Sequence, residues 1–446
     1  MNETASAAKM VWRATCLVLA AMTVSIPAHA TNGMWMIGYG AKATSLGGAG
    51  VANPVDGMAA AYNPALMTAV GEARMDLTIE LFRPPRRVSH ESSEFPADSR
   101  SKDDFYPIPS LGAVLSSPET PFAMGMAVIG AGAGTNYPQN FFNKSGNAYD
   151  RVGVFVMQMQ MLPSIAYRID EHNSLGASLS IAMQTFRAFG LEDFGSRGYS
   201  SDRSKLTNNG YDWSFGWGYR LGWLGTYLNE KFHLGLVYAP RVEMQKFNRY
   251  TGLFANHGEF DIPESYAVGM SLQMTPKTKV VADIQRIMWN DVDSIGNPGP
   301  LANDSAKFFP SCTGGLNVSG NRELCGTGGD LGLGFGWRNQ IVYKIGVEYK
   351  YNKDLTVRGG LNYGKTPIQR DEVLFNMLAP ATTEKHVTAG FTKAMDKDSD
   401  FTFTFMHAFK NTICGPTAFS PYPYDQENAC IAMAATSLSF AYGLRF

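Results

Sequence analysis

The eight residues 359–366 match the glycine, lysine and threonine pattern of a phosphate-binding loop. Such a loop binds phosphate because it connects a strand to a helix whose N-terminal amides face the anion. Here an alternation of apolar residues continues through the match, from Leu355 to Tyr363, and Pro367 follows it. The local pattern indicates a strand without the helix, so we interpret the match as coincidental.

Two other sets of residues could bind a metal or catalyse hydrolysis. Residues 396–400 resemble a calcium-binding loop, but Phe401 occupies the position where that loop requires glycine. His386 and His407 lie on neighbouring expected strands, and the alternation places them on opposite faces. We therefore predict no catalytic residue, no metal site and no cofactor, and an enzyme is the least favoured alternative.

Four of the five cysteines form two close pairs in the sequence. Cys312 and Cys325 flank a segment rich in Gly, Asn and Ser, and Cys414 and Cys430 flank one rich in Pro, Tyr and Asn. The spacings match no zinc-binding pattern, which argues against the alternative of a metal site. They predict two disulfides that staple loops in an oxidising compartment.

The first thirty residues have the features of a secretory signal. Lys9 and Arg13 precede an apolar run over residues 14–26, and the small-residue triplet 28–30 follows. This pattern predicts a signal peptide over residues 1–30 that is cleaved on export, with Met10 as an alternative start. The other interpretation is a membrane anchor, for which the run is short.

The composition of the chain is unusual for a soluble protein. Hydrophobic residues make up 45% of it and charged residues only 17%, below the quarter or so that is typical of soluble domains. Yet no apolar stretch beyond the leader is long enough for a membrane helix, which excludes a helical transporter. The net charge of -1 gives no indication of nucleic-acid binding.

The elements that position all these residues are strands with one apolar face. In residues 437–446, large apolar side chains alternate strictly with small or polar ones, and the chain stops on Phe446. In residues 211–223, seven large residues alternate with Asp, Ser, Arg and glycines. Alternation over this length is typical of strands that face lipid on one side.

The same alternation recurs along the rest of the chain from residue 72 onward. The connectors are in turn short and long, as expected of a barrel with short turns at one end and long loops at the other. We predict an all-β transmembrane barrel of about 14 antiparallel strands over residues 72–446, with both cysteine pairs in outer loops. The other expected strands include 107–117, 121–131, 231–242, 264–274, 279–290, 338–351, 354–364, 384–395 and 400–410.

Residues 31–71 do not alternate and are rich in Gly and Ala. Small residues permit close packing, and Asn63 with Pro64 marks a fixed turn. We expect this segment to form a plug in the lumen of the barrel. The alternative is a linker outside the barrel.

Several features of the mature chain together resemble the FadL/TodX family of outer-membrane channels for hydrophobic compounds. They are the Gly-rich opening, the triplet Asn63, Pro64 and Ala65, the barrel that begins a few residues later, and the terminal Phe446. The resemblance covers the whole mature chain. Further matches are residues 260–263, Asp283, residues 337–339, 346–349 and 358–360.

The resemblance implies roles for particular residues. The N-terminal plug would be a hatch whose turn is formed by Asn63, Pro64 and Ala65. A kink in the third strand would open the barrel sideways at Gly130, Gly132 and Gly134, which otherwise are only a Gly-rich strand end. Phe446 would be the signal that the barrel assembly machinery reads. Independently of the resemblance, the position near the mature N-terminus could reach the lumen, which makes candidate pocket residues of Met34, Trp35, Met36 and Ile37. Their simpler interpretation is packing of the plug.

The expected function is an outer-membrane channel for passive uptake of hydrophobic compounds, either long-chain fatty acids or monoaromatic hydrocarbons. A hydrophobic pocket favours such cargo because burial contributes about 0.8 kcal/mol per methylene. We expect a monomer in the outer membrane of a Gram-negative cell, surrounded by lipid and lipopolysaccharide. The alternatives are a general polar porin and a structural barrel.

Overall fold

The structure is a computed structural model that describes residues 32–91, 96–102, 105–142, 150–196, 199–300, 322–417 and 428–446. The expected signal peptide and Cys312 lie outside these residues. No helix in the described part of the chain is both long enough and apolar enough to cross a membrane.

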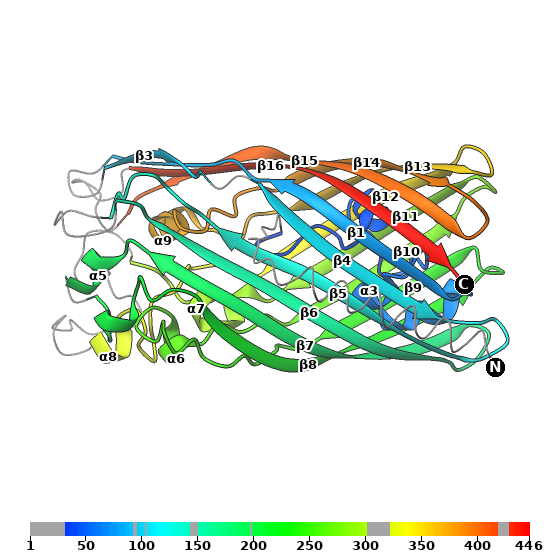
Figure 1. Cartoon of the computed structure of the whole chain (residues 1–446), viewed down its shortest axis with the longest axis horizontal. Helices are drawn as coiled ribbons and strands as arrows, with labels where there is room; N and C mark the ends of the chain where they lie inside the picture. Colours follow the sequence, from blue (N-terminus) through cyan, green and yellow to red (C-terminus); the bar gives the residue numbers. More distant parts are fainter. Residues whose placement is uncertain are drawn as a thin grey trace.

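Strands dominate the described residues and form one closed antiparallel sheet, a barrel (Figure 1). Closure comes from β1, which pairs with β4 on one side and with β16 on the other. The segments are β1 (Arg74–Arg83), β2 (Arg86–His90), β3 (Ala97–Arg100), β4 (Tyr106–Leu115), β5 (Phe122–Gly134), β6 (Gly153–Arg168), β7 (Asn173–Phe189), β8 (Asp212–Tyr227), β9 (Phe232–Ala239), β10 (Ser265–Gln273), β11 (Thr278–Ile287), β12 (Gln340–Lys350), β13 (Leu355–Gly364), β14 (Lys385–Ala394), β15 (Ser399–Gly415) and β16 (Ala429–Arg445).

Two of the barrel strands are each divided into two segments. Pro84 and Pro85 separate β1 from β2, and both segments pair with β16. Likewise β4 pairs with β1 while β3 pairs with β2. The sixteen described segments therefore make fourteen strands, which confirms the predicted fold class.

Short helices lie in the lumen and in the long connectors. They are α2 (Ala41–Thr44), α3 (Ala59–Tyr62), η1 (Pro64–Leu66), α4 (Met67–Val70), α5 (Glu192–Ser196), η2 (Arg203–Lys205), α6 (Ala255–Gly258), η3 (Trp289–Asp291), α7 (Asp293–Gly296), α8 (Arg322–Cys325), η4 (Arg370–Glu372) and α9 (Val373–Asn376). In Figure 1, α5 to α8 gather at the end opposite the C-terminus. We call this the long-loop end and the other the short-turn end.

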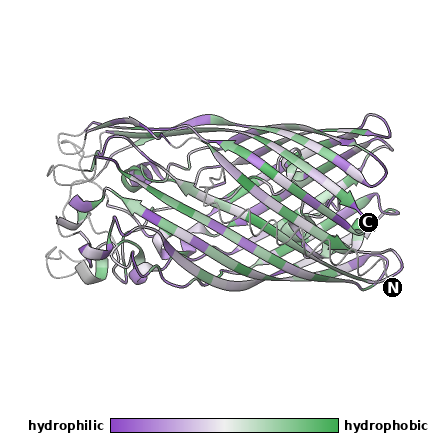
Figure 2. Ribbon diagram, in the orientation of Figure 1, coloured by the Kyte–Doolittle hydropathy of each residue, from purple (hydrophilic) through white to green (hydrophobic). Residues whose placement is uncertain are grey.

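The alternation of side chains between the two faces agrees with the sequence pattern. On β8, Trp213, Phe215 and Trp217 are exposed on the outside while Ser214 is buried inside. On β16, Tyr442 is exposed while Ser437 and Ser439 are buried. Figure 2 shows how hydrophobic and hydrophilic residues alternate along the strands.

Most expected strands lie within a few residues of their predicted bounds, and two differ for a physical reason. The strand expected over 231–242 ends as β9 at Ala239, because Pro240 has no N–H to donate to the ladder. The strand expected over 400–410 extends to Gly415. Beyond the lipid-facing part it is stabilised by inward packing of Ile413 with the apolar cluster of the long-loop end.

The disulfide prediction is confirmed for the second cysteine pair, but its position is different. Cys414 and Cys430 are directly opposite each other on β15 and β16 and are joined by a disulfide. The disulfide therefore joins the two strands at the base of the loop and does not connect two positions within the loop. Cys325 is also disulfide-bonded, while Cys312, its predicted partner, is outside the described residues.

Residues 32–71, which we call the N-terminal segment, contact the inner faces of many strands. The Gly50 and Val51 N–H groups donate to the Asp283 carboxylate of β11 at 2.7 and 3.1 Å. The Thr404 hydroxyl of β15 donates to the Ala41 carbonyl at 2.7 Å. Figure 1 shows α3 inside the cylinder of strands.

Candidate functional site

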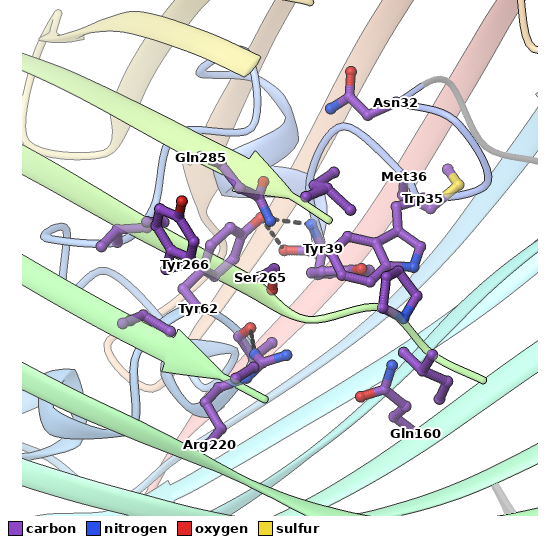
Figure 3. Close-up of a pocket in the computed structure, with 18 of the residues that line it drawn as sticks. Asn32, Trp35, Met36, Tyr39, Tyr62, Gln160, Arg220, Ser265, Tyr266 and Gln285 are labelled. Carbon is purple, nitrogen blue, oxygen red and sulfur yellow. Dashed lines mark hydrogen bonds between the residues drawn. The ribbon is translucent and has the colours of Figure 1, made fainter. Parts of the chain in front are cut away.

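A cavity inside the barrel, which we call the inner cavity, lies between the N-terminal segment and the inner wall (Figure 3). Three of the four predicted pocket residues, Trp35, Met36 and Ile37, line it, whereas Met34 packs in the apolar cluster nearby. The wall contributes residues of β6 to β12 that include Gln160, Ser180, Arg220, Val237, Ser265, Gln285 and Lys344.

Two tyrosines and an arginine give the inner cavity its polar groups. The Tyr62 hydroxyl donates to the Tyr39 carbonyl at 2.9 Å and accepts from the Tyr39 N–H, so it fixes the backbone there. Arg220 donates from one guanidinium nitrogen to the Ala61 carbonyl, while its buried Nε has no hydrogen-bond partner among the described residues. On the apolar side, Trp35 packs edge-on against Trp289 with ring centroids 5.4 Å apart.

The free volume of the inner cavity is only about 60 Å³. Pockets that bind small molecules usually have volumes of roughly 300–1,000 Å³, so this space is small by comparison. A hydrocarbon ligand therefore requires the lining to move. The N-terminal segment contributes much of that lining, so its attachments to the barrel decide how readily the cavity can widen.

The turn at Asn63 attaches the N-terminal segment to the wall. The Asn63 side-chain amide donates to the carbonyls of Val51 and Trp223 at 3.0 and 2.9 Å, and its oxygen accepts from the Ala65 N–H at 3.0 Å. The chain approaches β8 so closely here that a Cβ on Gly222 would lie 2.0 Å from the Asn63 Oδ1. Glycine is required at this position for the turn to dock.

A cluster of buried charges makes a second attachment. The Lys42 ammonium of α2 lies 2.9 Å from the Asp400 carboxylate and 3.4 Å from that of Asp76. Arg74 contacts both carboxylates at 2.6 Å, and Arg445 contacts Asp400 at 2.9 Å. Each buried carboxylate thus meets at least two cations, which offsets the cost of removing the charges from water.

A second cavity, the loop cavity, lies at the long-loop end. It is formed mainly by apolar side chains from four connectors, and the rings of Phe194 and Phe375 pack edge-on with centroids 5.7 Å apart. Its lining includes Phe186, Leu191, Leu206, Leu253, Phe254, Leu333, Phe335 and Leu378. Such a cluster at the mouth of a barrel offers an apolar ligand its first place to leave water.

The pairing of β5 is complete on one side only. It pairs with β6 over its whole length, but its ladder to β4 ends where Leu111 faces Val128. No bridge joins residues 129–133 to residues 106–110, all of which are described.

The three glycines predicted as a lateral opening, Gly130, Gly132 and Gly134, fall in this half-paired stretch. The Gly132 N–H donates instead to the carbonyl of Met34 at 3.3 Å, and Arg86 donates to the carbonyl of Gly134. The opening stays a prediction, which the interrupted ladder supports.

The remaining sequence motifs have plain structural roles. The apparent phosphate-binding loop is mostly strand β13, and the next helical turn, η4, begins only at Arg370. His386 is buried inside the barrel, whereas His407 lies on the outer face and contacts Thr436. Phe446 follows β16, and its N–H donates to the Ala73 carbonyl at 2.9 Å.

The sequence reasoning missed Lys42, Arg220 and the loop cavity as a site. Lys42 could have been singled out from the sequence, because it is a lone charge in a run of small residues. Arg220 was placed correctly on the inner face, but its contact with Ala61 depends on how the N-terminal segment folds. The phenylalanines of the loop cavity come from separate connectors and carry no common motif.

Near the loop cavity, Glu372 makes the long-loop end sensitive to pH. Its buried carboxylate accepts from the Gly299 N–H at 2.7 Å. Burial raises the pKa of Glu372 from 4.5 to about 7, and the neighbouring Asp371 adds to the increase. The folded protein therefore prefers the protonated Glu372, and this contribution to the free energy of unfolding is fully present below pH 4.5. About 3 kcal/mol of it is lost as the pH rises through 7.

Hydrogen exchange of the amides in residues 366–378 checks this expectation. After correction for the intrinsic rate, their protection should fall between pH 5 and pH 8. The Glu372→Gln variant, which keeps the side-chain shape without the charge, should show little change. An equal fall in both proteins would contradict the assignment to Glu372.

Comparison with known proteins agrees with this architecture. Residues 19–442 match the family model described as outer membrane protein transport protein (OMPP1/FadL/TodX). No curated protein matches the chain by sequence.

Among solved structures, the Pseudomonas putida toluene transporter TodX is 18% identical, with 92% of this chain and 99% of that chain covered and a TM-score of 0.65. The Ralstonia pickettii toluene transporter TbuX is 18% identical, with coverage of 92% and 99% and a TM-score of 0.59. A Pseudomonas aeruginosa FadL homologue is 13% identical, with coverage of 92% and 98% and a TM-score of 0.60. These structures share the fold, and the match of the family model over residues 19–442 shows that the chain belongs to the FadL/TodX family of outer-membrane transport proteins.

Proposed function

We propose that this protein is a passive channel that carries small hydrophobic molecules across the outer membrane. The proposal rests on two cavities, the apolar loop cavity at the long-loop end and the inner cavity beside the N-terminal segment. The similarity to two toluene transporters and to a FadL homologue supports the same class of cargo.

The route begins at the long-loop end, which faces the outside of the cell. The loop cavity has a free volume of about 40 Å³, so its lining must also move to admit a ligand. The ligand gains from entry because its apolar surface leaves water there, at roughly 25 cal/mol per Å². It then moves toward the inner cavity past Phe186 and Trp35. No energy source is needed, because the concentration gradient drives the transfer.

The N-terminal segment acts as the hatch in this proposal. The inner cavity is too small for a hydrocarbon until its lining moves. The turn of Asn63, Pro64 and Ala65 is the attachment that would shift, since one side chain links the segment to itself at Val51 and to the wall at Trp223. A widened cavity would then release the ligand sideways at Gly130, Gly132 and Gly134, where β5 has lost its pairing with β4.

Deletion of the gene tests the proposal against the alternative of a general polar porin. Cells without the protein should grow poorly at low concentrations of toluene or of oleate, while uptake of small sugars stays the same. Growth on the two substrates also decides which cargo is carried. Unchanged growth on both, together with reduced sugar uptake, would overturn the proposal in favour of the porin.

A further inference from the structure

The barrel wall has a second interruption, between β8 and β9, on strands other than the half-paired β5. The ladder of β8 with β9 stops where Leu221 faces Tyr238. Farther toward the long-loop end, the segment after β9 pairs with β8 again only at an isolated bridge between Gly216 and Met244. No bridge joins residues 217–220 of β8 to residues 239–243, all of which are described.

The next ladder, between β9 and β10, is interrupted at the same place. It ends at the pair of Ala239 and Ser265, and the chains meet again at Val242 and Ile262. Between these pairs stand Pro240 and Pro263, neither of which has an N–H to donate. Two neighbouring ladders, β8 with β9 and β9 with β10, therefore both lack residue pairs around Pro240.

The inner cavity extends into this interruption. Its lining includes Ala239 and Pro240 from the end of β9 and Pro263 from the start of β10. It also includes Tyr219 and Tyr266, which belong to the outward faces of their strands and are 47% and 40% exposed. The inner cavity is therefore lined in part by residues whose side chains belong to the outer face of the barrel.

The outer surface is hollowed beside the same place. This hollow has a free volume of about 430 Å³ and is lined almost entirely by apolar atoms, with Leu221, Leu236 and Val268 among them. It shares Val237, Tyr266 and Ala267 with the inner cavity. The two spaces therefore adjoin across β9 and β10 at Val237 and Ala267, two residues before the β9–β10 ladder ends at Ala239 and Ser265.

We infer that the interruption around Pro240 is a side port through which an apolar ligand passes between the inner cavity and the membrane. Its outer rim carries the rings of Tyr219, Tyr238 and Tyr266, which are apolar in the body and polar at the tip, as suits the edge of a lipid layer. The Tyr238 hydroxyl donates to Glu264 at 2.9 Å, so it remains satisfied beside lipid. The identity of the cargo rests on the proposed function, whereas the opening is a property of the wall.

Quenching by brominated phospholipid tests the port without any transported ligand. A bimane label is placed on Ala239→Cys at the rim and, in a separate variant, on Gln285→Cys. Gln285 lines the same cavity from β11, whose pairing with β10 and β12 is continuous there. The native cysteines seen in disulfides do not react with the label.

In bilayers, brominated lipid should lower the emission at position 239 at least threefold relative to plain lipid, and the emission at position 285 much less. Equal quenching at both positions, or none at either, would overturn the port. If Ala239→Cys fails to fold, Ser265→Cys takes its place, since these residues face each other across the two strands. A loss of the proposed uptake function would leave this result unaffected, so the two proposals fail separately.

Discussion

Replacement of Lys42 by methionine is expected to loosen the N-terminal segment by about 3 kcal/mol, because removing one partner from a buried charge cluster leaves the others uncompensated. Asp400 and Asp76 would keep Arg74 as a partner, and Asp400 would also keep Arg445. The expected loss therefore lies at the low end of the range that is usual when one partner of a buried ion pair is removed. Methionine retains the length of the side chain, which separates the loss of charge from a loss of packing.

Hydrogen exchange of the amides in residues 41–50 measures the effect. A loss of 3 kcal/mol corresponds to roughly a hundredfold fall in protection. The Lys42→Arg variant keeps the charge and should retain most of the protection. If Lys42→Met is as protected as the unmodified protein, the N-terminal segment is held by its other contacts and the charge cluster has a different role.

Replacement of Gly222 by alanine is expected to displace the turn at Asn63 from the wall. The added Cβ would lie 2.0 Å from the Asn63 Oδ1 and 2.9 Å from the Pro64 Cδ. Neither contact can be accommodated without moving the turn, and the hydrogen bond from Asn63 to Trp223 would then be lost. Overpacking of this kind costs about 1–3 kcal/mol. The fraction of molecules in which the turn has left the wall should therefore rise about 5- to 150-fold.

Uptake of a large polar dye by cells reports this change, since a displaced segment leaves the lumen open to water. The matched control is Gly359→Ala on β13, where the added Cβ would meet no atom closer than the Thr388 carbonyl oxygen at 3.7 Å. Dye uptake should rise in the Gly222 variant and stay at its normal level in the control. Equal uptake in both would show that the turn does not seal the barrel.

The strands could be predicted because the membrane imposes a simple rule on each of them. Most lipid-facing side chains must be apolar, so the alternation in residues 211–223 and 437–446 is visible without knowing which strands pair. The strand that was predicted too long, at 231–242, is the one where Pro240 broke the ladder. The proline was present in the sequence, but only the pairing of Ala239 with Ser265 brings Pro263 close to it on the neighbouring segment.

The site was less predictable because its contacts join distant parts of the chain. Lys42 meets Asp400 only because barrel closure places β15 beside the strands that follow the N-terminal segment. The contact of Asn63 with β8 likewise depends on the fold of the whole segment. Family resemblance pointed to the turn, whereas nothing local in the sequence shows that Lys42 meets Asp400 or that Pro240 lies near Pro263.

A channel of this kind must hold hydrophobic molecules in the lumen of its barrel. Crystals grown with bromobenzene and, separately, with a brominated long-chain fatty acid would test it through the anomalous signal of bromine. We expect bromine in the loop cavity near Phe194 and Phe375 and, with the N-terminal segment shifted, in the inner cavity near Trp35 and Tyr39. Bromine found only on the lipid-facing surface with both ligands would contradict the account.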